Sequence, residues 1–370
     1  MPADPIKREE ASMKLGAGLH GKLGAMAFAG VTALLSQTGL AAAQEMDFGG
    51  EELLVQTYGG TLASYFRDNF AAEFNEKYNA NVIVEEGLST DTVAKLRAGS
   101  GLPHVDTFMV TMPWAIVLNA EGLTEPLSVE TVPNIEVIDQ TARVEGDGFV
   151  TYQRTSMTIA YNKNEVDPAD LPATWEDLAD PKYAGKLTLP VPGNAHAVML
   201  IAKLTQDATG ALDDITPAIE VLNTIAPNVQ TYWTSFDQAF NLLNSGQSWL
   251  SVNSTDRTID QILKGAPIGT YFPEEGTTMM SNTIGIAKGT EHKELAEAWI
   301  NFVLEADVQE RIGNDLGFQP IRPDVVLKPE VAELFPSGAA LENSLFPDWG
   351  DIANKQAEWI DIYTRQVSGN

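Results

Sequence analysis

The stretch LLVQTYGGTLASYF, Leu53–Phe66, decides the fold class of this 370-residue chain. Its first part, Leu53–Thr57, is a short apolar run that predicts a buried strand, and Tyr58, Gly59 and Gly60 then interrupt it. Beyond the glycines, apolar side chains recur every four positions, as on one face of an amphipathic helix: Leu62, Phe66, Phe70, Phe74 and Tyr78. We therefore expect a strand, a loop and a helix in immediate succession.

The same kind of unit occurs twice more along the chain. Residues Asn81–Glu85 predict a second strand, and Ser89 or Thr90 can cap the helix that follows it. Residues Val105–Val110 predict a third strand, which leads into Thr111 and the start of another helix. Strands and helices that alternate at this spacing are typical of a parallel α/β sheet.

The loops that follow these strands are candidate binding loops. In open α/β sheets, ligands bind beyond the carboxyl ends of the strands, where helices begin. Glycine lets the backbone approach a ligand closely, and tyrosine offers a ring face and a hydroxyl. Trp114 has an alternative role as a packing residue at the start of a helix. The first group of ligand-binding candidates is Tyr58, Gly59, Ser89, Thr90, Thr111 and Trp114.

The N-terminus predicts export. Basic residues precede the apolar run Leu23–Leu35, and the small residues Ala41–Ala43 stand just before Gln44. This order is that of a secretory signal peptide with a cleavage site. We expect residues 1–43 to be removed, with residues 1–12 as an over-extended start, and the mature protein to be periplasmic.

The composition excludes several classes of function. The chain has 23 basic and 51 acidic residues, a net charge of −28, so its surface should repel nucleic acid. It has no cysteine, which excludes thiol nucleophiles, disulfides and thiolate metal sites. The four histidines are not at metal-ligand spacing, and the sequence lacks a P-loop and a serine-nucleophile elbow. We expect a binding protein rather than an enzyme, with no metal, no cofactor and no nucleic-acid partner.

The middle of the chain differs from its start because two long extended passages interrupt the alternation. These passages, residues 149–161 and 271–289, have the composition of strands. Helices are predicted at Ala195–Leu204 and Ala218–Ile225, and a helix followed by a strand at Ser235–Asn253. The tail is predicted to be helical at Lys293–Leu304, Val308–Gly313 and Asn354–Tyr363.

Three motifs resemble one known family. They are LLVQTYGG, the run PATWEDLADPKYAGKLTLP that begins at Pro172, and PEEGTTM at Pro273–Met279. Over essentially the whole mature sequence, the chain resembles the bacterial periplasmic solute-binding proteins of ABC importers, in the cluster that binds polyamines and ferric iron. The resemblance implies a two-lobed α/β fold, the type II periplasmic binding fold, with two crossing strands between the lobes. The crossings would fall near Phe149–Tyr161 and Met279–Ala287.

The resemblance also implies a division into lobes and a set of partners. Lobe 1 would contain residues 44–153 and 284–370, and lobe 2 would contain residues 154–283. A small-molecule solute would bind in the cleft between them. A monomeric protein would then deliver the solute to the permease and ATPase subunits at the inner membrane, without catalysing a reaction.

A second group of candidates lies in the later half of the chain. Asp256 and Arg257 follow a predicted strand, and such a pair suits a zwitterion or a carboxylate, because arginine can hold a carboxylate with two hydrogen bonds. The alternative is a local ion pair or a pair of helix-capping charges. His196 begins a helix, where packing or capping is the alternative to ligand contact. The second group is His196, Trp233, Ser235, Asp256, Arg257, Met280 and Asn282.

Met280 and Asn282 bear on the identity of the ligand. In polyamine binders of the family the matching positions carry tryptophan and aspartate, which offer an amine a ring face and a negative charge. Their replacement favours a small polar organic solute with an amine, a carboxylate or both, and a polyamine such as spermidine or putrescine is the alternative. Adjacent tyrosines, typical of the ferric binders, are also absent from the sequence. A ferric-iron binder and an extracytoplasmic enzyme on the same fold are favoured less.

Overall fold

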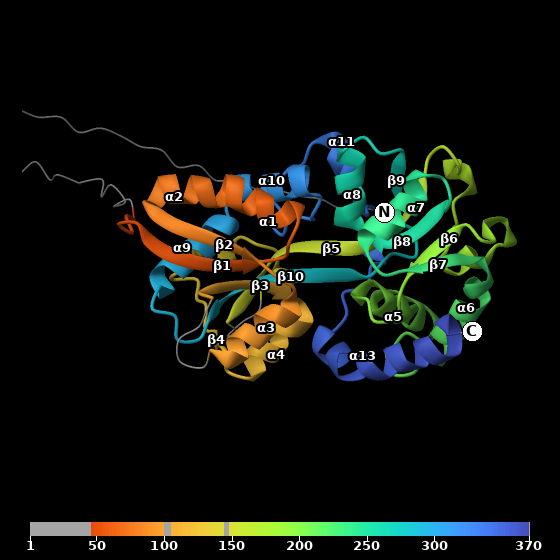
Figure 1. The fold of residues 1–370 in the computed structure, drawn as a ribbon, viewed down its shortest axis with the longest axis horizontal. Helices are drawn as coiled ribbons and strands as arrows, with labels where there is room; N and C mark the ends of the chain where they lie inside the picture. Colours follow the sequence, from red (N-terminus) through yellow and green to blue (C-terminus); the bar gives the residue numbers. More distant parts are fainter. Residues whose placement is uncertain (1–45, 100–104, 144–147, 370) are drawn as a thin grey trace, which may run out of the picture. The chain divides into compact units, whose positions relative to one another are not determined.

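The computed structural model describes residues 46–99, 105–143 and 148–369, so the predicted signal peptide lies outside the described residues. Within this part of the chain, ten strands form one sheet (Figure 1). They are β1 (Glu51–Thr57), β2 (Ala80–Glu86), β3 (Thr107–Thr111), β4 (Thr124–Glu125), β5 (Phe149–Asn162), β6 (Leu187–Pro190), β7 (Val229–Trp233), β8 (Leu250–Ser254), β9 (Ile268–Tyr271) and β10 (Met279–Ala287).

Helices connect the strands and cover the sheet on both faces. In Figure 1, α1, α2, α8 and α10 lie above the strands, whereas α3, α4, α5 and α13 lie below them. The α-helices are α1 (Thr61–Tyr65), α2 (Ala72–Tyr78), α3 (Ser89–Ala98), α4 (Met112–Ala120), α5 (Ala195–Thr209), α6 (Thr216–Ile225), α7 (Phe236–Asn244), α8 (Thr255–Leu263), α9 (Lys293–Val303), α10 (Ala306–Leu316), α11 (Pro329–Ala332), α12 (Ala339–Glu342) and α13 (Trp349–Tyr363). Short 3₁₀ or π turns are η1 (Phe66–Ala71), η2 (Pro133–Glu136), η3 (Gln140–Ala142), η4 (Pro168–Asp170), η5 (Glu176–Ala179), η6 (Pro181–Tyr183), η7 (Ala226–Asn228) and η8 (Thr364–Ser368).

The first helical segment shows how the four-residue apolar spacing is accommodated. In an ideal α-helix four residues turn about 40° too far, so such a stripe would drift around the helix. Between α1 and α2 the chain forms the π segment η1, whose wider turn corrects this drift. The apolar residues of the stripe consequently face one core, and three of them, Phe66, Phe70 and Phe74, are fully buried.

The sheet joins a parallel part to a mixed part. The strand order is β2-β1-β3-β10-β5-β8-β6-β7, and β1 is parallel to both β2 and β3. The predicted α/β class, with strands and helices alternating at the start of the chain, is therefore confirmed. β10, far along the sequence, inserts antiparallel between β3 and β5, and every residue of β5 is buried.

Two apolar cores lie at opposite ends of the long strands β5 and β10. The first core combines residues of β1, η1, α9 and α10, including Phe66 and Trp299. The second combines Trp175 with residues of β6, α5, α6 and α13, including Trp359. Because β5 contributes Tyr152 to the first core and Ile159 to the second, it runs from one core to the other.

Candidate ligand-binding cleft

One side of the candidate cleft is formed by the loops after β1, β2 and β3. Tyr58 follows β1, Ser89 begins α3, and Thr111 is the N-cap residue of α4. The Thr111 N–H lies within hydrogen-bonding distance of Ser89 Oγ, at 3.4 Å. Gly60 has a φ of 79°, a left-handed conformation that favours glycine at the start of α1. Of the predicted residues, Tyr58, Ser89 and Thr111 therefore meet at one edge of the sheet.

The floor of the cleft is formed by β5 and β10. Asn282 on β10 is paired with Gln153 on β5 on one side and with Thr111 on the other. Directly paired residues project to the same face of a sheet, as do residues two apart on one strand. Gln153, Thr155 and Asn282 therefore share a face, and the Tyr58 hydroxyl reaches Asn282 Oδ1 at 3.4 Å.

The opposite side is formed by the end of β8 and the start of α8. Asp256 is 5% exposed, and its Oδ1 accepts a hydrogen bond from the Thr155 hydroxyl at 2.6 Å and another from the Ser254 hydroxyl. Its Oδ2 lies 3.4 Å from Nε of Arg257. The Arg257 guanidinium in turn lies over the ring of Phe236, 5.5 Å from its centroid. Asp256 and Arg257 thus form a local pair, and the carboxylate is held at the crossing strand β5.

Tyr58 and Asp256 are close enough to influence each other. Burial of the Tyr58 hydroxyl raises its pKa, the nearby negative charge of Asp256 adds to this effect, and the Ser89 hydroxyl opposes it. Tyr58 is therefore a neutral hydrogen-bonding group at any physiological pH. A ligand between the two sides would meet a phenol, amides and one carboxylate.

His196 stands at the start of α5, beside the aromatic start of α7. Its backbone N–H donates to Asn194 Oδ1 at 2.9 Å, and its Nδ1 lies 3.1 Å from the same oxygen. The imidazole ring packs edge-on against Phe236, with ring centroids 5.7 Å apart. Burial lowers the pKa of His196 to about 4, although the nearby Asp256 opposes this shift and Arg257 reinforces it. The ring is therefore neutral near pH 7.

The remaining predicted residues lie at varied distances from this cluster. The Trp233 indole is completely buried, and its Nε1–H donates to the Val252 carbonyl at 3.2 Å. Trp114 is half-buried and packs against the core formed by α3 and α4.

Met280 is buried with the second core, whereas Gly59 lies beside Glu86. Thr90 is exposed, and Ser235 is exposed and caps α7, accepting from the Gln238 N–H at 3.2 Å.

Three polar residues of the candidate cleft were not predicted from the sequence. Gln153, Thr155 and Ser254 lie on strands, and Gln153 is completely buried with both amide atoms lacking a hydrogen-bond partner. One feature of the sequence could have pointed to Gln153 and Thr155. Four consecutive polar residues, QRTS at Gln153–Ser156, stand within the long β-rich run. A buried polar side chain without a partner is costly, so its presence in a strand between two cores indicates a site.

Two pockets open beside this cluster. The larger, with a volume of about 400 Å³, lies between Gly60 and Thr61 on one side and Phe236 and Arg257 on the other. A smaller pocket of about 10 Å³ separates Leu62 from Asp256 and Arg257. The pockets mark the place where the two sides of the cleft face each other near α8.

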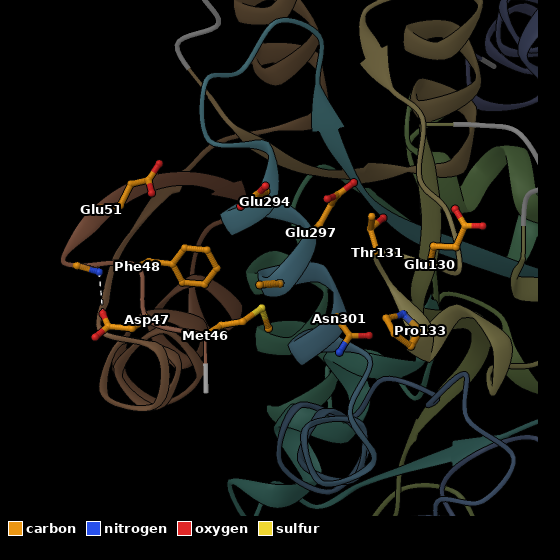
Figure 2. Close-up of a pocket in the computed structure, with 12 residues that line it drawn as sticks. Met46, Asp47, Phe48, Glu51, Glu130, Thr131, Pro133, Glu294, Glu297 and Asn301 are labelled. Carbon is orange, nitrogen blue, oxygen red and sulfur yellow. Dashed lines mark hydrogen bonds between the residues drawn. The ribbon is translucent and has the colours of Figure 1, made fainter. Parts of the chain in front are cut away.

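A pocket of about 890 Å³ lies elsewhere, beside α9, and we call it the α9 pocket (Figure 2). Carboxylates from several elements surround it, including Glu51 and Glu297. None of the predicted ligand-binding residues lines it. Its lining residues are Met46, Asp47, Phe48, Gly49, Glu51, Glu130, Thr131, Pro133, Glu294, Glu297, Ala298 and Asn301.

No group of three or more histidine, aspartate or glutamate side chains in residues 46–99, 105–143 and 148–369 is arranged to hold a metal ion. In the same ranges, no helix combines the length and the apolar character needed to span a membrane.

The chain is similar to known proteins over most of its length. The family model of bacterial extracellular solute-binding proteins matches residues 69–336, more than half of the chain. The spermidine/putrescine-binding periplasmic protein of Escherichia coli is 23% identical over 318 residues, which cover 82% of this chain and 89% of the relative. A periplasmic protein of Salmonella typhimurium, named as a candidate for binding 2-aminoethylphosphonate, is 24% identical over 78% of this chain and 84% of its own.

The fold has solved counterparts. An ABC transporter protein from Clostridium perfringens superposes with a TM-score of 0.71 at 21% identity, over 85% of this chain and 99% of its own. The chain belongs to the family of bacterial extracellular solute-binding proteins of ABC transporters. The predicted resemblance and the two-lobed fold are confirmed. The relatives named here are transport proteins rather than enzymes.

Proposed function

We propose that this protein binds a small polar organic solute that bears an amine, with or without a carboxylate, in the cleft between β1–β3 and β8. Asp256 carries this proposal. It is a nearly buried carboxylate that accepts from two hydroxyls and has Arg257 beside its other oxygen, and its charge acts on Tyr58. A desolvated ammonium needs such a charge, because an unpaired buried ion is strongly disfavoured.

The ligands named for two relatives support an amine. One relative is named for spermidine and putrescine and the other for 2-aminoethylphosphonate, and each of these molecules has a primary amine. Polyamine binding is the second candidate for this chain. The first of these relatives favours it, whereas Asn282 disfavours it, because polyamine binders of the family carry aspartate at the matching position.

The proposed architecture divides the protein at β5 and β10. Lobe 1 would contain residues 44–153 and 284–370, and lobe 2 residues 154–283. The buried residues of α13 belong to the second core, which favours counting that helix with lobe 2. Ligand would stabilise the closed arrangement because it contacts both sides at once.

The proposed cellular role follows from the family. The protein would be exported after cleavage of residues 1–43, act as a periplasmic monomer, and pass its solute to a permease and its ATPase. It would catalyse no reaction and need no cofactor. The cleavage prediction is checked by the N-terminal sequence of the periplasmic protein, which should begin near Gln44.

The binding function is tested by native mass spectrometry of protein purified from a bacterial periplasm under mild conditions. We expect one amine-bearing solute per chain in the wild type and none in Asp256→Asn. A wild type that carries only a solute without an amine, or that retains the solute equally well after Asp256→Asn, would contradict the proposal.

A further inference from the structure

His196 presents a hydrogen-bond acceptor that no described residue satisfies. Asn194 Oδ1 accepts the hydrogen bond of the backbone N–H of His196, which identifies that atom as the amide oxygen. An oxygen cannot donate, so Nδ1, 3.1 Å away, must carry the ring proton. The other ring nitrogen, Nε2, is consequently left with a lone pair. It is buried and has no hydrogen-bond partner.

The surroundings of His196 keep the ring in place. Phe236 packs against it edge-on and Trp233 lies 6.3 Å away between ring centroids. The Asn194 contact fixes the ring at its other nitrogen. The imidazole therefore has little freedom to turn Nε2 toward water, and the buried lone pair costs stability unless a ligand satisfies it.

Asp256 and His196 are connected through Phe236. The Arg257 guanidinium, 3.4 Å from Asp256 Oδ2, lies over the ring of Phe236, and His196 packs against the same ring. Asp256 Oδ1 already receives the hydroxyls of Thr155 and Ser254, so an arriving cation would meet a carboxylate held in one orientation. A charged acceptor and a neutral acceptor thus occupy the same side of the cleft. The group that satisfies both is an ammonium with at least two N–H bonds.

We propose that His196 determines specificity by accepting a hydrogen bond at Nε2 from an N–H of the ligand's ammonium, while Asp256 neutralises its charge. The site then selects primary amines over quaternary ammonium compounds. A trimethylammonium group has the same charge but no N–H, so it would leave Nε2 buried without a partner. This inference rests on the proposed function and adds to it how the site distinguishes a primary amine from a quaternary one.

The test measures binding of matched ligand pairs by calorimetry. The probes are γ-aminobutyrate, 2-aminoethylphosphonate and putrescine, each beside the same compound with one amine trimethylated. The variants are His196→Gln, which can place an amide oxygen where Nε2 stood, and His196→Asn and His196→Phe, which cannot. His292→Asn is the matched control, because His292 is a partly exposed histidine paired with Glu51 at 2.5 Å, far from the cluster in sequence.

For the wild type we expect the primary amine to bind roughly a hundredfold more tightly than its trimethylated form. His196→Phe and His196→Asn should lose roughly ten- to hundredfold in affinity for the primary amine, and little for the trimethylated form. His196→Gln should retain most of the wild-type preference, and His292→Asn all of it. Equal affinity for the two forms, or an unchanged preference in His196→Phe, would overturn the inference.

A second measurement uses the wild type alone and is unaffected by misfolding of a variant. The ¹⁵N spectrum of His196 should show the Nδ1–H tautomer before ligand is added, and Nε2 should shift in the direction of hydrogen bonding when the primary amine binds. An unshifted Nε2 in the saturated complex would contradict the role of His196 and leave the proposed function standing. Failure of the wild type to bind any primary amine would instead contradict the proposed function itself.

Discussion

The cleft and the α9 pocket both carry carboxylates, but their hydrogen bonding differs. The α9 pocket is the larger of the two, yet none of its described lining residues has a buried polar atom without a partner. Glu297 pairs with Lys293 from its own helix, and Glu51 lies 2.5 Å from Nδ1 of His292. Asp256 of the cleft is likewise paired, with Arg257. In the cleft, both amide atoms of Gln153 and Nε2 of His196 are buried without partners.

This difference is why we propose the cleft, rather than the α9 pocket, as the recognition site. Paired carboxylates occur in both places, so an ion pair alone does not distinguish them. A buried polar atom without a hydrogen-bond partner destabilises the ligand-free protein. A ligand that supplies the missing hydrogen bond removes this free-energy cost. The volume of a pocket carries less information than the hydrogen bonds still available in it.

The largest expected effect is the loss of the cleft carboxylate. Asp256→Asn removes the charge that pairs with the ligand's ammonium and should weaken binding of γ-aminobutyrate or putrescine by more than a hundredfold, or about 3–5 kcal/mol. Glu294→Gln in the α9 pocket is the control and should change affinity less than twofold. Titration calorimetry compares them, and a larger loss in Glu294→Gln would reverse the comparison.

The second prediction contrasts a histidine of the cleft with one beside the α9 pocket. The pKa of His196 is lowered to about 4, so the unfolded chain binds more protons below about pH 6.5 and the folded state loses stability as the pH falls toward 4. The loss is on the order of 3 kcal/mol. The pKa of His292 is raised, chiefly by its hydrogen bond to Glu51, so its contribution is present at low pH and lost as the pH rises through the folded pKa.

Urea unfolding between pH 4 and pH 8 measures these contributions. Relative to the wild type, His196→Gln should flatten the acid limb of the stability curve, whereas His292→Gln should steepen it. If the free energy of unfolding depended on pH in the same way in both variants, the two imidazoles would have similar environments, which would contradict the structure.

The third prediction concerns the buried amide of Gln153. Replacing it with leucine removes two unsatisfied polar atoms, so the ligand-free protein should gain about 1–2 kcal/mol in free energy of unfolding. The same change should lower the affinity for the solute roughly tenfold, because the floor of the cleft loses its hydrogen bonds. Thermal unfolding and calorimetry on one preparation test both effects. A variant that is destabilised and binds normally would identify Gln153 as a structural residue.

The smallest expected effect separates the two candidate ligand classes. Asn282→Asp adds a negative charge beside Tyr58, so it should tighten binding of a diamine such as putrescine by roughly tenfold and weaken binding of γ-aminobutyrate by a similar factor. Calorimetric titration with both compounds is the measurement. Tight putrescine binding that Asn282→Asp improves would favour polyamine as the ligand over a zwitterion.

The sequence predicted the start of the fold well because local patterns determine it. The strand at Leu53–Thr57 lies within β1, and the stripe after the glycines forms the helical run α1–η1–α2. The position of β10 between β3 and β5 had no local signal, because antiparallel pairing of distant segments depends on the cores that they cover. The C-terminal helix was predicted from Asn354, whereas α13 begins five residues earlier, at Trp349, behind an aspartate cap.

The candidate cleft was predictable in outline and not in detail. Ligands in open α/β sheets bind beyond the carboxyl ends of the strands, and this rule predicted Tyr58, Ser89 and Thr111. In the structure these three residues lie close together. Gln153 was missed because nothing in a continuous β-rich run shows which face meets the cleft until the register with Asn282 is known. Trp233 was a candidate because of its residue type, and the sequence could not show that its indole is fully buried.

The central claim is that the cleft, rather than the α9 pocket, is the place of solute recognition. A crystal structure of the protein with its co-purified solute tests this directly. We predict electron density for one solute molecule, with its amine nitrogen within hydrogen-bonding distance of Asp256 and His196 Nε2 and its far end toward Tyr58 and Asn282. Density for the solute in the α9 pocket, with the cleft residues unchanged, would contradict the account.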